Sequence, residues 1–238
     1  MQLFYLKKLI EGDCVLDAEE SKHCVQILRH KAGDWIAVTN GIGQTAQAEI
    51  TNANPNRCVL KISSIVFNER PEKNTLHIAF APTKSSDRTE WFIEKATEFG
   101  VAKITFIKSR YSERDKINLD RYRKVALSAM KQSLRCYLPN LVGVLGFDEF
   151  IDTYSNNVEN KFIAHCNTKI ERAPFTTMFQ EKAGEIIVMI GPEGDFSETE
   201  IQKGLGAGFS SVHIGGARLR AETAAVAVSS FNYFEGIK

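Results

Sequence analysis

The sequence has 238 residues, of which 43% are hydrophobic and 25% are charged, and its formal net charge is +1. These proportions are typical of a globular protein with a buried core, and they exclude a disordered chain and collagen. No run of about 18 apolar residues predicts a membrane span, and the first residues lack the features of a secretory signal, so we expect a cytoplasmic protein. Five scattered cysteines without C-x-x-C spacing predict buried thiols, and neither a disulfide framework nor a metal site. They are Cys14, Cys24, Cys58, Cys136 and Cys166.

The near-zero net charge hides an uneven distribution along the chain. Residues 1–70 have 8 basic and 8 acidic side chains, residues 71–145 have 14 and 8, and residues 146–238 have 8 and 13. The middle third therefore has a charge of +6 and the last third −5. Six surplus cations make the middle third a candidate surface for a polyanion, although composition alone favours solvated helix faces.

Short apolar runs alternate with polar turns in the first third of the chain. Ser21 is expected to cap a helix over residues 21–30. From Trp35 to Ile65, β-rich runs are separated by Gly, Asn and Pro residues. This pattern is typical of antiparallel hairpins in a small barrel.

The pattern changes after a polar stretch around Pro71, where we place a domain boundary between residues 1–70 and 71–238. From there on, six apolar runs alternate with helical stretches. This alternation predicts a parallel sheet with helices on both faces, whose ligand lies at the carboxyl ends of the strands. The apolar runs are TLHIAFA, AKITFI, NLVGVL, KFIAHC, EIIVMI and SSVHIG, and the helices are expected near Ser86–Phe99, Leu119–Arg135, Phe147–Thr153, Ser197–Leu205 and Ala221–Glu235.

The segment IGPEGDFS, residues 190–197, joins the strand EIIVMI to a helix. Ser197 is expected to cap that helix, with Glu200 at the capping-box position. Two glycines around a Pro-Glu pair form a tight loop whose backbone can lie against a flat ligand. An ordinary strand-to-helix turn is the alternative, but such a turn rarely needs two glycines and a proline within four residues. We therefore favour a ligand site.

The segment IGGARLRAETAA, residues 214–225, also follows a strand and begins with paired glycines. Arg218 and Arg220 come next, and a helix of small residues follows. At the carboxyl end of a strand, these arginines are expected to point toward the same crevice as the first glycine loop. Pairing with acidic residues on the surface is the alternative.

These two segments, together with DRTEWFIEKATEFGV, SERD, MKQSLRCYLP and ESKHCVQILRHKAGD, resemble the RsmE family of ribosomal RNA methyltransferases over nearly the whole chain. The resemblance implies a PUA-like, RNA-binding β-barrel over residues 1–70. It also implies an α/β SPOUT domain with a C-terminal trefoil knot over residues 71–238. The chain departs from the family pattern in two places. Asp195 stands where a second glycine is usual, and the arginine often found two residues after the strand-end glycine is replaced, with Ala217 and Arg218 in a shifted arrangement.

The activity that the resemblance implies is methylation of N3 of a uridine near the 3′ end of 16S ribosomal RNA. S-adenosylmethionine is the implied cofactor, the protein is expected to be a homodimer, and its partner is the RNA or the small ribosomal subunit. Two alternatives stay open. One is another SPOUT activity, on transfer RNA or a 2′-hydroxyl, and the other is a non-catalytic RNA-binding factor in ribosome assembly.

Carried onto this chain, the resemblance places the cofactor pocket on three loops, each at the end of a predicted strand. No metal is expected, because the methyl group leaves a sulfonium. For His165 we favour the alternative of a partly buried histidine at a strand end. The implied cofactor-binding residues are His165, Cys166, Asn167, Ile190, Gly191, Pro192, Glu193, Gly194, Ile214, Gly215, Gly216, Ala217, Leu219 and Arg220.

Arg220 is the residue we expect to stabilise the negative charge on uracil O2 or O4 as N3 loses its proton, because a guanidinium offers two parallel donors. Glu193 or Glu222 is expected to accept that proton. Each glutamate has an alternative role: Glu193 in shaping its loop, and Glu222 in holding an arginine. The predicted RNA-binding residues, for which solvated charge is the alternative, are His23, Arg29, Arg88, Arg110, Arg114, Lys131, Gln132, Ser133 and Arg135.

Overall fold

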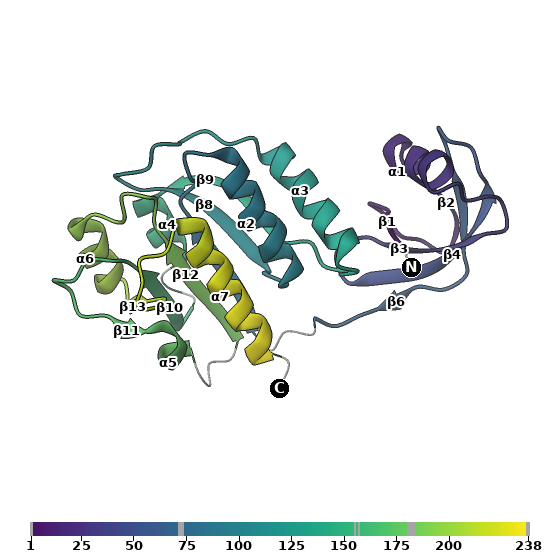
Figure 1. Ribbon diagram of the computed structural model, residues 1–238. Coiled ribbons are helices and arrows are strands. Elements are labelled where there is room, and N and C mark those ends of the chain that lie inside the picture. The colour runs from purple at the N-terminus through teal and green to yellow at the C-terminus, as the bar shows by residue number, and fades with distance from the viewer. Residues whose placement is uncertain (1, 71–73, 155, 157, 180–183, 237–238) are drawn as a thin grey trace. The chain divides into compact units, whose positions relative to one another are not determined.

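The computed structural model describes residues 2–70, 74–154, 156, 158–179 and 184–236, and the chain in it forms two compact units (Figure 1). The first unit comprises Met1–Arg70 and Leu127–Leu138, and the second comprises Pro71–Ala126 and Pro139–Lys238. The segment Leu127–Leu138, which the sequence prediction placed in the second domain, thus belongs to the first unit. None of the helices in the described ranges is long and apolar enough to cross a membrane.

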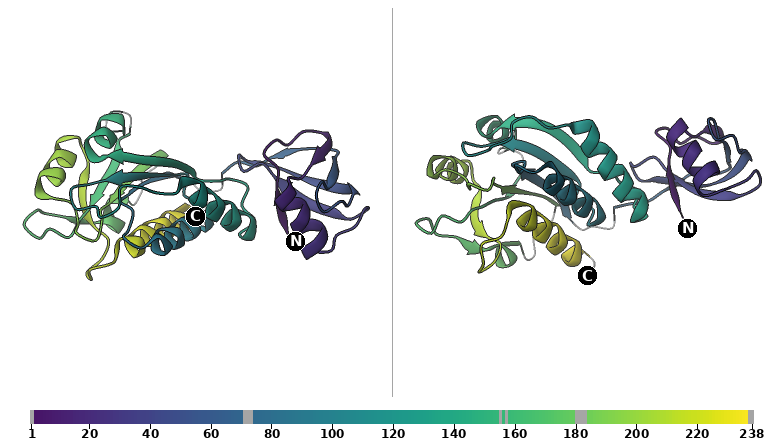
Figure 2. Two further views of the ribbon diagram at one scale, coloured as in Figure 1. Left: turned by 90° about the horizontal axis from the view of Figure 1, so that it is seen from above. Right: turned by 45° about the horizontal axis from the view of Figure 1, so that its top comes forward.

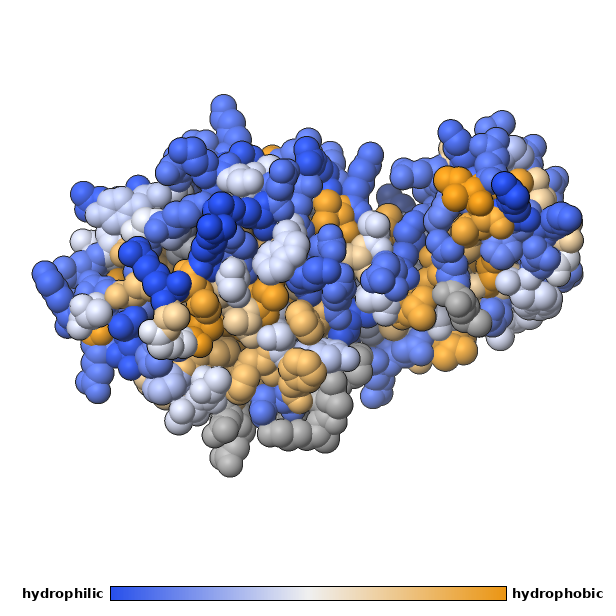
Figure 3. Space-filling view, in the orientation of Figure 1, coloured by the Kyte–Doolittle hydropathy of each residue, from blue (hydrophilic) through white to orange (hydrophobic). Residues whose placement is uncertain are grey.

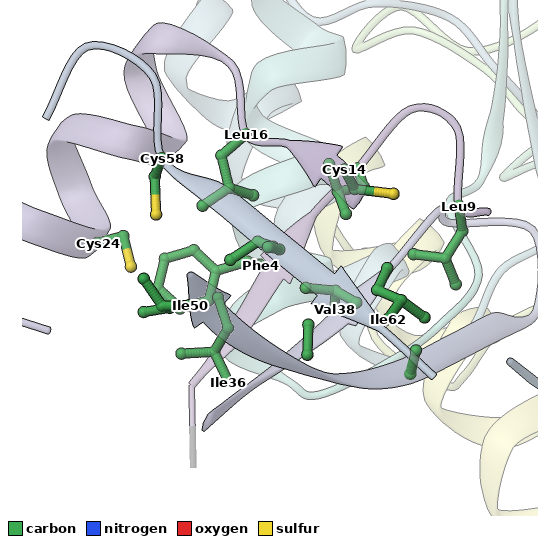
Figure 4. Packing of buried hydrophobic residues seen from close by; sticks show 14 residues of the cluster. Phe4, Leu9, Cys14, Leu16, Cys24, Ile36, Val38, Ile50, Cys58 and Ile62 are labelled. Atoms are coloured by element: carbon green, nitrogen blue, oxygen red, sulfur yellow. The ribbon is translucent and has the colours of Figure 1, made fainter. Parts of the chain in front are cut away.

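A sheet forms the centre of the first unit, with the strand order β1-β3-β4-β5-β2 and with β6 paired to β4. The pairs β3–β4 and β4–β5 are antiparallel as predicted. The pair β2–β5 is antiparallel too, and β1 runs parallel to β3. Buried side chains from the strands and the helix meet in one apolar cluster (Figure 4). The elements are β1 (Leu3–Tyr5), β2 (Gly12–Val15), α1 (Ala18–Lys22), the π-helical turn η1 (His23–Ile27), β3 (Trp35–Thr39), β4 (Gln44–Asn52), β5 (Val59–Ile62) and β6 (Val66–Phe67).

The helix of the first unit begins earlier than predicted, and Ser21 does not cap it. Asp17 is the N-cap, and its carboxylate accepts a hydrogen bond from the backbone N–H of Glu20 at 2.8 Å. Ser21 is fully buried instead: its hydroxyl donates to the carbonyl of Leu16 at 3.0 Å and accepts from the N–H of Cys58 at 2.9 Å. The prediction was wrong because the Ser21 hydroxyl satisfies backbone groups inside the unit, and the contact with Cys58, 37 positions away, leaves no sequence pattern.

The second unit contains a parallel sheet with the strand order β11-β13-β10-β12-β7-β8-β9. In the described residues, every pair of neighbouring strands in this sheet is parallel, as the alternation of strands and helices predicted. The short strand β11 was not predicted. The strands are β7 (Asn74–Phe80), β8 (Lys103–Lys108), β9 (Asn140–Gly146), β10 (Asn160–Ala164), β11 (Ala173–Pro174), β12 (Gly184–Ile190) and β13 (Ser210–His213).

Helices cover both faces of this sheet. The rings of Phe80 on β7 and Phe92 on α2 lie 4.5 Å apart, which places α2 on one face, and α7 lies beside α2 there (Figures 1 and 2). The next residue on β7, Ala79, points to the other face and joins a cluster with residues of α4 and α6. The helices are α2 (Ser86–Glu98), α3 (Leu119–Gln132), α4 (Phe147–Tyr154), α5 (Phe175–Phe179), α6 (Glu198–Gly206) and α7 (Ala221–Gly236).

The strand order brings three distant loops together. Strand β10 lies between β13 and β12, and all three run in the same direction. The loops that follow them therefore leave the sheet at one edge. They are the three loops predicted to form the cofactor pocket.

Candidate functional site

A cavity of about 700 Å³ lies where β10, β12 and β13 end. The three loops line it together with the first turn of α7. Every residue predicted for the cofactor pocket lines this cavity except Gly194. Residues that the prediction did not include also line it, namely Ala164, Thr168, Arg172, Asp195, His213, Arg218, Ala221 and Ala224.

The loop after β12 is compact and needs its glycines. A Cβ atom on Gly191 would lie 3.2 Å from the Phe196 ring, and one on Gly194 would lie 2.8 Å from the Cβ of Tyr111. The loop ends at Ser197, which caps α6 in a capping box with Glu200 as predicted. Gly191 thus gives the backbone room at the wall of the cavity, and Gly194 lets the loop approach Tyr111.

The loop after β13 offers free backbone donors. Residues 215–220 are exposed. The backbone N–H groups of residues 216–219 have no hydrogen-bond partner among the described residues. Arg218 and Arg220 line the cavity, and neither forms an ion pair with any acidic residue that the structure describes. Free backbone donors beside a cavity are typical of a site that binds a polar ligand.

His165 is a buried residue at the end of β10, only 4% exposed, as we favoured. Its Nε2 lies 2.7 Å from the hydroxyl of Ser211, which donates to the carbonyl of Glu171 at 2.8 Å. Nε2 therefore carries the proton of this pair. Burial lowers the pKa of His165, and the nearby Asp195 carboxylate opposes this shift in part. The imidazole is neutral near pH 7, and it lies in the cavity wall.

The family of this chain follows from its similarity to known proteins. Residues 70–232 match the model of an RNA methyltransferase domain, and residues 16–63 match that of an RNA methyltransferase PUA domain. The ribosomal RNA small subunit methyltransferase E of Mesomycoplasma hyopneumoniae is 30% identical over 182 residues, which are 74% of this chain and 75% of that protein. The chain belongs to the family of ribosomal RNA small subunit methyltransferases E. The resemblance that the sequence motifs indicated is confirmed.

Solved structures of similar proteins confirm the fold class of this family member. A probable rRNA methyltransferase from Porphyromonas gingivalis has a TM-score of 0.89 and 34% identity, over 97% of this chain and 96% of that one. A small subunit methyltransferase E from Neisseria gonorrhoeae, bound to S-adenosylmethionine, has a TM-score of 0.80 and 26% identity, over 97% and 95%. A PUA-like unit followed by an α/β domain with a parallel sheet is therefore the fold of this chain. The trefoil knot stays a prediction.

The cavity of this methyltransferase fits a nucleoside cofactor. Its volume lies within the range of about 300–1,000 Å³ that is common for small-molecule sites. The free N–H groups of residues 216–219 can form hydrogen bonds with the polar edge of a base, and the glycines allow a flat ring to approach the backbone closely.

Cys166 also lies in the cavity wall and is exposed, which corrects the prediction that the thiols are all buried. None of the five cysteines, all of which the structure describes, is in a disulfide.

The structure separates the two predicted proton acceptors. Glu193 lines the cavity, and its carboxylate accepts a hydrogen bond from the backbone N–H of Lys84 at 3.1 Å. Glu222 does not line the cavity. It is buried in the first turn of α7, where its Oε1 lies 3.7 Å from Nε of Arg88. Glu222 thus contacts an arginine, as its alternative role requires, and Glu193 connects its loop to the backbone at Lys84.

The residues predicted to bind RNA divide between the two units. His23, Arg29, Lys131, Gln132, Ser133 and Arg135 belong to the first unit, and Arg88, Arg110 and Arg114 belong to the second. Several have partners inside the protein. The Lys131 ammonium forms an ion pair with the buried carboxylate of Glu20, and Arg114 donates to the carbonyl of Lys84 at 2.8 Å. Ser133, which follows helix α3, donates to the Ala129 carbonyl of that helix at 2.7 Å. The sequence contained no signal for these contacts, because the ion pair and the Arg114 bond join distant segments.

Proposed function

We propose that this protein transfers a methyl group from S-adenosylmethionine to N3 of a uridine in 16S ribosomal RNA. The observation that carries the proposal is the cavity at the ends of β10, β12 and β13, with Arg220 in its wall. The Neisseria relative, which shares this fold, holds the same cofactor. In this chain, the loops at residues 165–168, 190–195 and 214–220 would hold it. When bound, it supplies an electrophilic methyl group on a sulfonium.

The residues of the chain have to manage the proton and the charge of the uracil ring. Arg220 is exposed and lines the cavity, so its guanidinium is free to meet the O2 or O4 atom that becomes negative when N3 is deprotonated. Of the two predicted acceptors, Glu193 lies in the cavity wall, which supports its role in taking the N3 proton. Glu222 is better suited to holding Arg88 in position.

The first unit is proposed to recognise the RNA, as the match to an RNA methyltransferase PUA domain supports. Arg29 is exposed and has a φ angle of 60°, so the chain turns sharply at this residue. His23 lies in the π-helical turn η1, an irregular element that is frequent at functional sites. Binding to an RNA backbone at these side chains would be sensitive to salt, because phosphate contacts release counterions.

A second copy of this chain is the proposed protein partner. Helix α7 is apolar on most of its circumference, and apolar side chains gather over it on the surface (Figure 3). Phe234 on α7 is 64% exposed and Trp91 on α2 is 42% exposed, although large aromatic side chains are usually well buried. An exposed apolar helix face of this kind marks a protein interface. The dimer would act in the cytoplasm, where ribosomal RNA is present.

The test is a methylation assay followed by nucleoside analysis. Purified protein and isotope-labelled S-adenosylmethionine are incubated with unmodified 16S RNA, with small ribosomal subunits and with transfer RNA. The expected product is 3-methyluridine in the ribosomal RNA. A label in transfer RNA or on a 2′-hydroxyl would support another SPOUT activity, and a chain that binds the RNA without transferring label would be an assembly factor. Either result would contradict the proposal.

A further inference from the structure

Asp195 has an unusual backbone conformation in the loop after β12. Its φ angle is 66°, in the left-handed region that residues other than glycine rarely adopt. Its backbone N–H donates to the carbonyl of Pro192 at 2.9 Å, which closes a tight turn. Aspartate tolerates this conformation better than most residues, because its short side chain can bond to nearby backbone groups.

Both carboxylate oxygens of Asp195 accept hydrogen bonds from backbone N–H groups. Oδ1 accepts from the next residue, Phe196, at 2.8 Å. Oδ2 accepts from Cys166 at 2.7 Å, across 29 positions of the sequence. Bonds to an ionised acceptor at these lengths are about twice as strong as bonds between neutral groups.

The bond to Cys166 joins two loops at the point where the sheet no longer does so. The last paired residues of β10 and β12 are Ala164 and Ile190, and both strands end there. Cys166 and Asp195 lie beyond that pair, and both line the cavity. On the other side, the N–H of His165 donates to the carbonyl of Val212 at 3.3 Å. The loop after β10 is therefore held between β13 and the carboxylate of Asp195.

We propose that Asp195 is a positioning residue that latches the loop after β10 to the loop after β12 and thereby sets the affinity of the cavity for S-adenosylmethionine. This inference rests on the proposed function for the identity of the ligand. Without the latch, the two loops are free to separate before the ligand binds, and binding has to order them. The latch acts on the affinity for the cofactor and leaves the methyl transfer itself unchanged.

The test compares Asp195→Gly and Asp195→Asn with the wild-type protein. Glycine accepts the left-handed backbone but removes the latch, and asparagine keeps the size of the side chain with only one acceptor oxygen. The matched control is Glu198→Gln, which removes an exposed carboxylate three residues away. In the free protein, amide hydrogen exchange at Cys166 should become at least 10-fold faster in Asp195→Gly. The Kd for S-adenosylmethionine, measured by calorimetry, should rise by roughly 10-fold, with a smaller rise in Asp195→Asn.

The turnover number at saturating cofactor should stay within about twofold of the wild-type value, so that the effect lies in KM. Unchanged exchange at Cys166 in Asp195→Gly would show that no latch exists. Faster exchange with an unchanged Kd would show that the latch does not control affinity. Near-ultraviolet circular dichroism shows whether Asp195→Gly keeps the fold. If it does not, amide exchange at Cys166 and the Kd for the cofactor in Asp195→Asn test the proposal instead. A wild-type protein that fails to bind the cofactor would contradict the proposed function, whereas the exchange result would still test the latch.

Discussion

The carboxylate of Glu222, buried at the start of α7, lies 3.7 Å from the guanidinium Nε of Arg88 on α2. Its other oxygen, Oε2, has no hydrogen-bond partner among the described residues. A buried carboxylate with a single partner depends strongly on that partner, because removing it leaves an uncompensated charge. Arg88 is half-exposed. The terminal nitrogens of its guanidinium can therefore contact a ligand while Glu222 stays beside Nε.

A double-mutant cycle tests whether Glu222 acts through Arg88. If it does, Glu222→Gln and Arg88→Ala should each lower kcat/KM for the RNA by about 10-fold, and the double variant should lose little more. The pH dependence of the rate should keep its shape in Glu222→Gln. If Glu222 instead accepts the N3 proton, its variant should flatten the pH profile and lower kcat even in the Arg88→Ala background.

Gly194→Val should abolish or strongly weaken cofactor binding, measured by calorimetry. A Cβ atom at this position would lie 2.8 Å from the Cβ of Tyr111, so the loop or Tyr111 has to move. Because Gly194 itself does not line the cavity, the effect is expected to reach the cofactor through a shift of the loop. Gly143→Val is the control, since nothing lies within 4 Å of its Cβ position on β9. If Gly194→Val binds the cofactor with wild-type affinity, this loop is not part of the binding site.

The positions of the three cavity loops in the sequence were predictable because each follows an apolar run, and two of them are marked by glycines. What could not be predicted is the strand order that makes β13, β10 and β12 neighbours. The latch between Asp195 and Cys166 depends on that order. Cys166 was therefore assigned to the pocket only through the resemblance, and the role of Asp195 required the structure.

The assignment of Lys131 shows a second limit of sequence patterns. A lysine in a basic segment predicts contact with a polyanion. In the structure its partner is Glu20, at a distance of 111 positions in the sequence, and that carboxylate also accepts from the N–H of Tyr5. Local patterns carry no information on such a contact. The segment Leu127–Leu138 belongs to the first unit by its contacts, although it includes the end of α3.

Lys131→Met should therefore destabilise the protein more than it weakens RNA binding. Loss of the ion pair leaves the buried Glu20 without its cation, which should lower the free energy of unfolding by about 2 kcal/mol. Lys124→Met is the matched control, because Lys124 lies exposed on the same helix. Urea unfolding measures the stability, and RNA titrations at several salt concentrations measure the number of phosphate contacts. If Lys131→Met leaves the stability unchanged, and the salt dependence of RNA binding shows one phosphate contact fewer, Lys131 binds the RNA as predicted.

Stability should fall in acid partly because of His77. Burial, with the Lys103 ammonium nearby, lowers the pKa of its imidazole to about 3, whereas the pKa in an unfolded chain is about 6.5. Between these values the unfolded state binds a proton that the folded state does not bind. The contribution of His77 to the free energy of unfolding is therefore fully present above pH 6.5. It declines as the pH falls toward 3, by up to about 1.4 kcal/mol per pH unit. Urea unfolding of His77→Gln should show a shallower pH dependence in this window, and an identical slope would contradict the assignment.

Arg220 provides the test of the chemical step. If its guanidinium stabilises the uracil anion, Arg220→Ala should lower kcat by roughly 10²–10³, the usual effect of losing one preorganised donor, while cofactor affinity survives. The single-turnover rate of the variant should then rise more steeply with pH, and to a higher pH, because it depends on spontaneous loss of the N3 proton. Arg220→Lys should recover only part of the rate, since an ammonium lacks two parallel donors. Parallel pH profiles would show that Arg220 only orients the RNA, and a loss of cofactor affinity would place its role in the cofactor site.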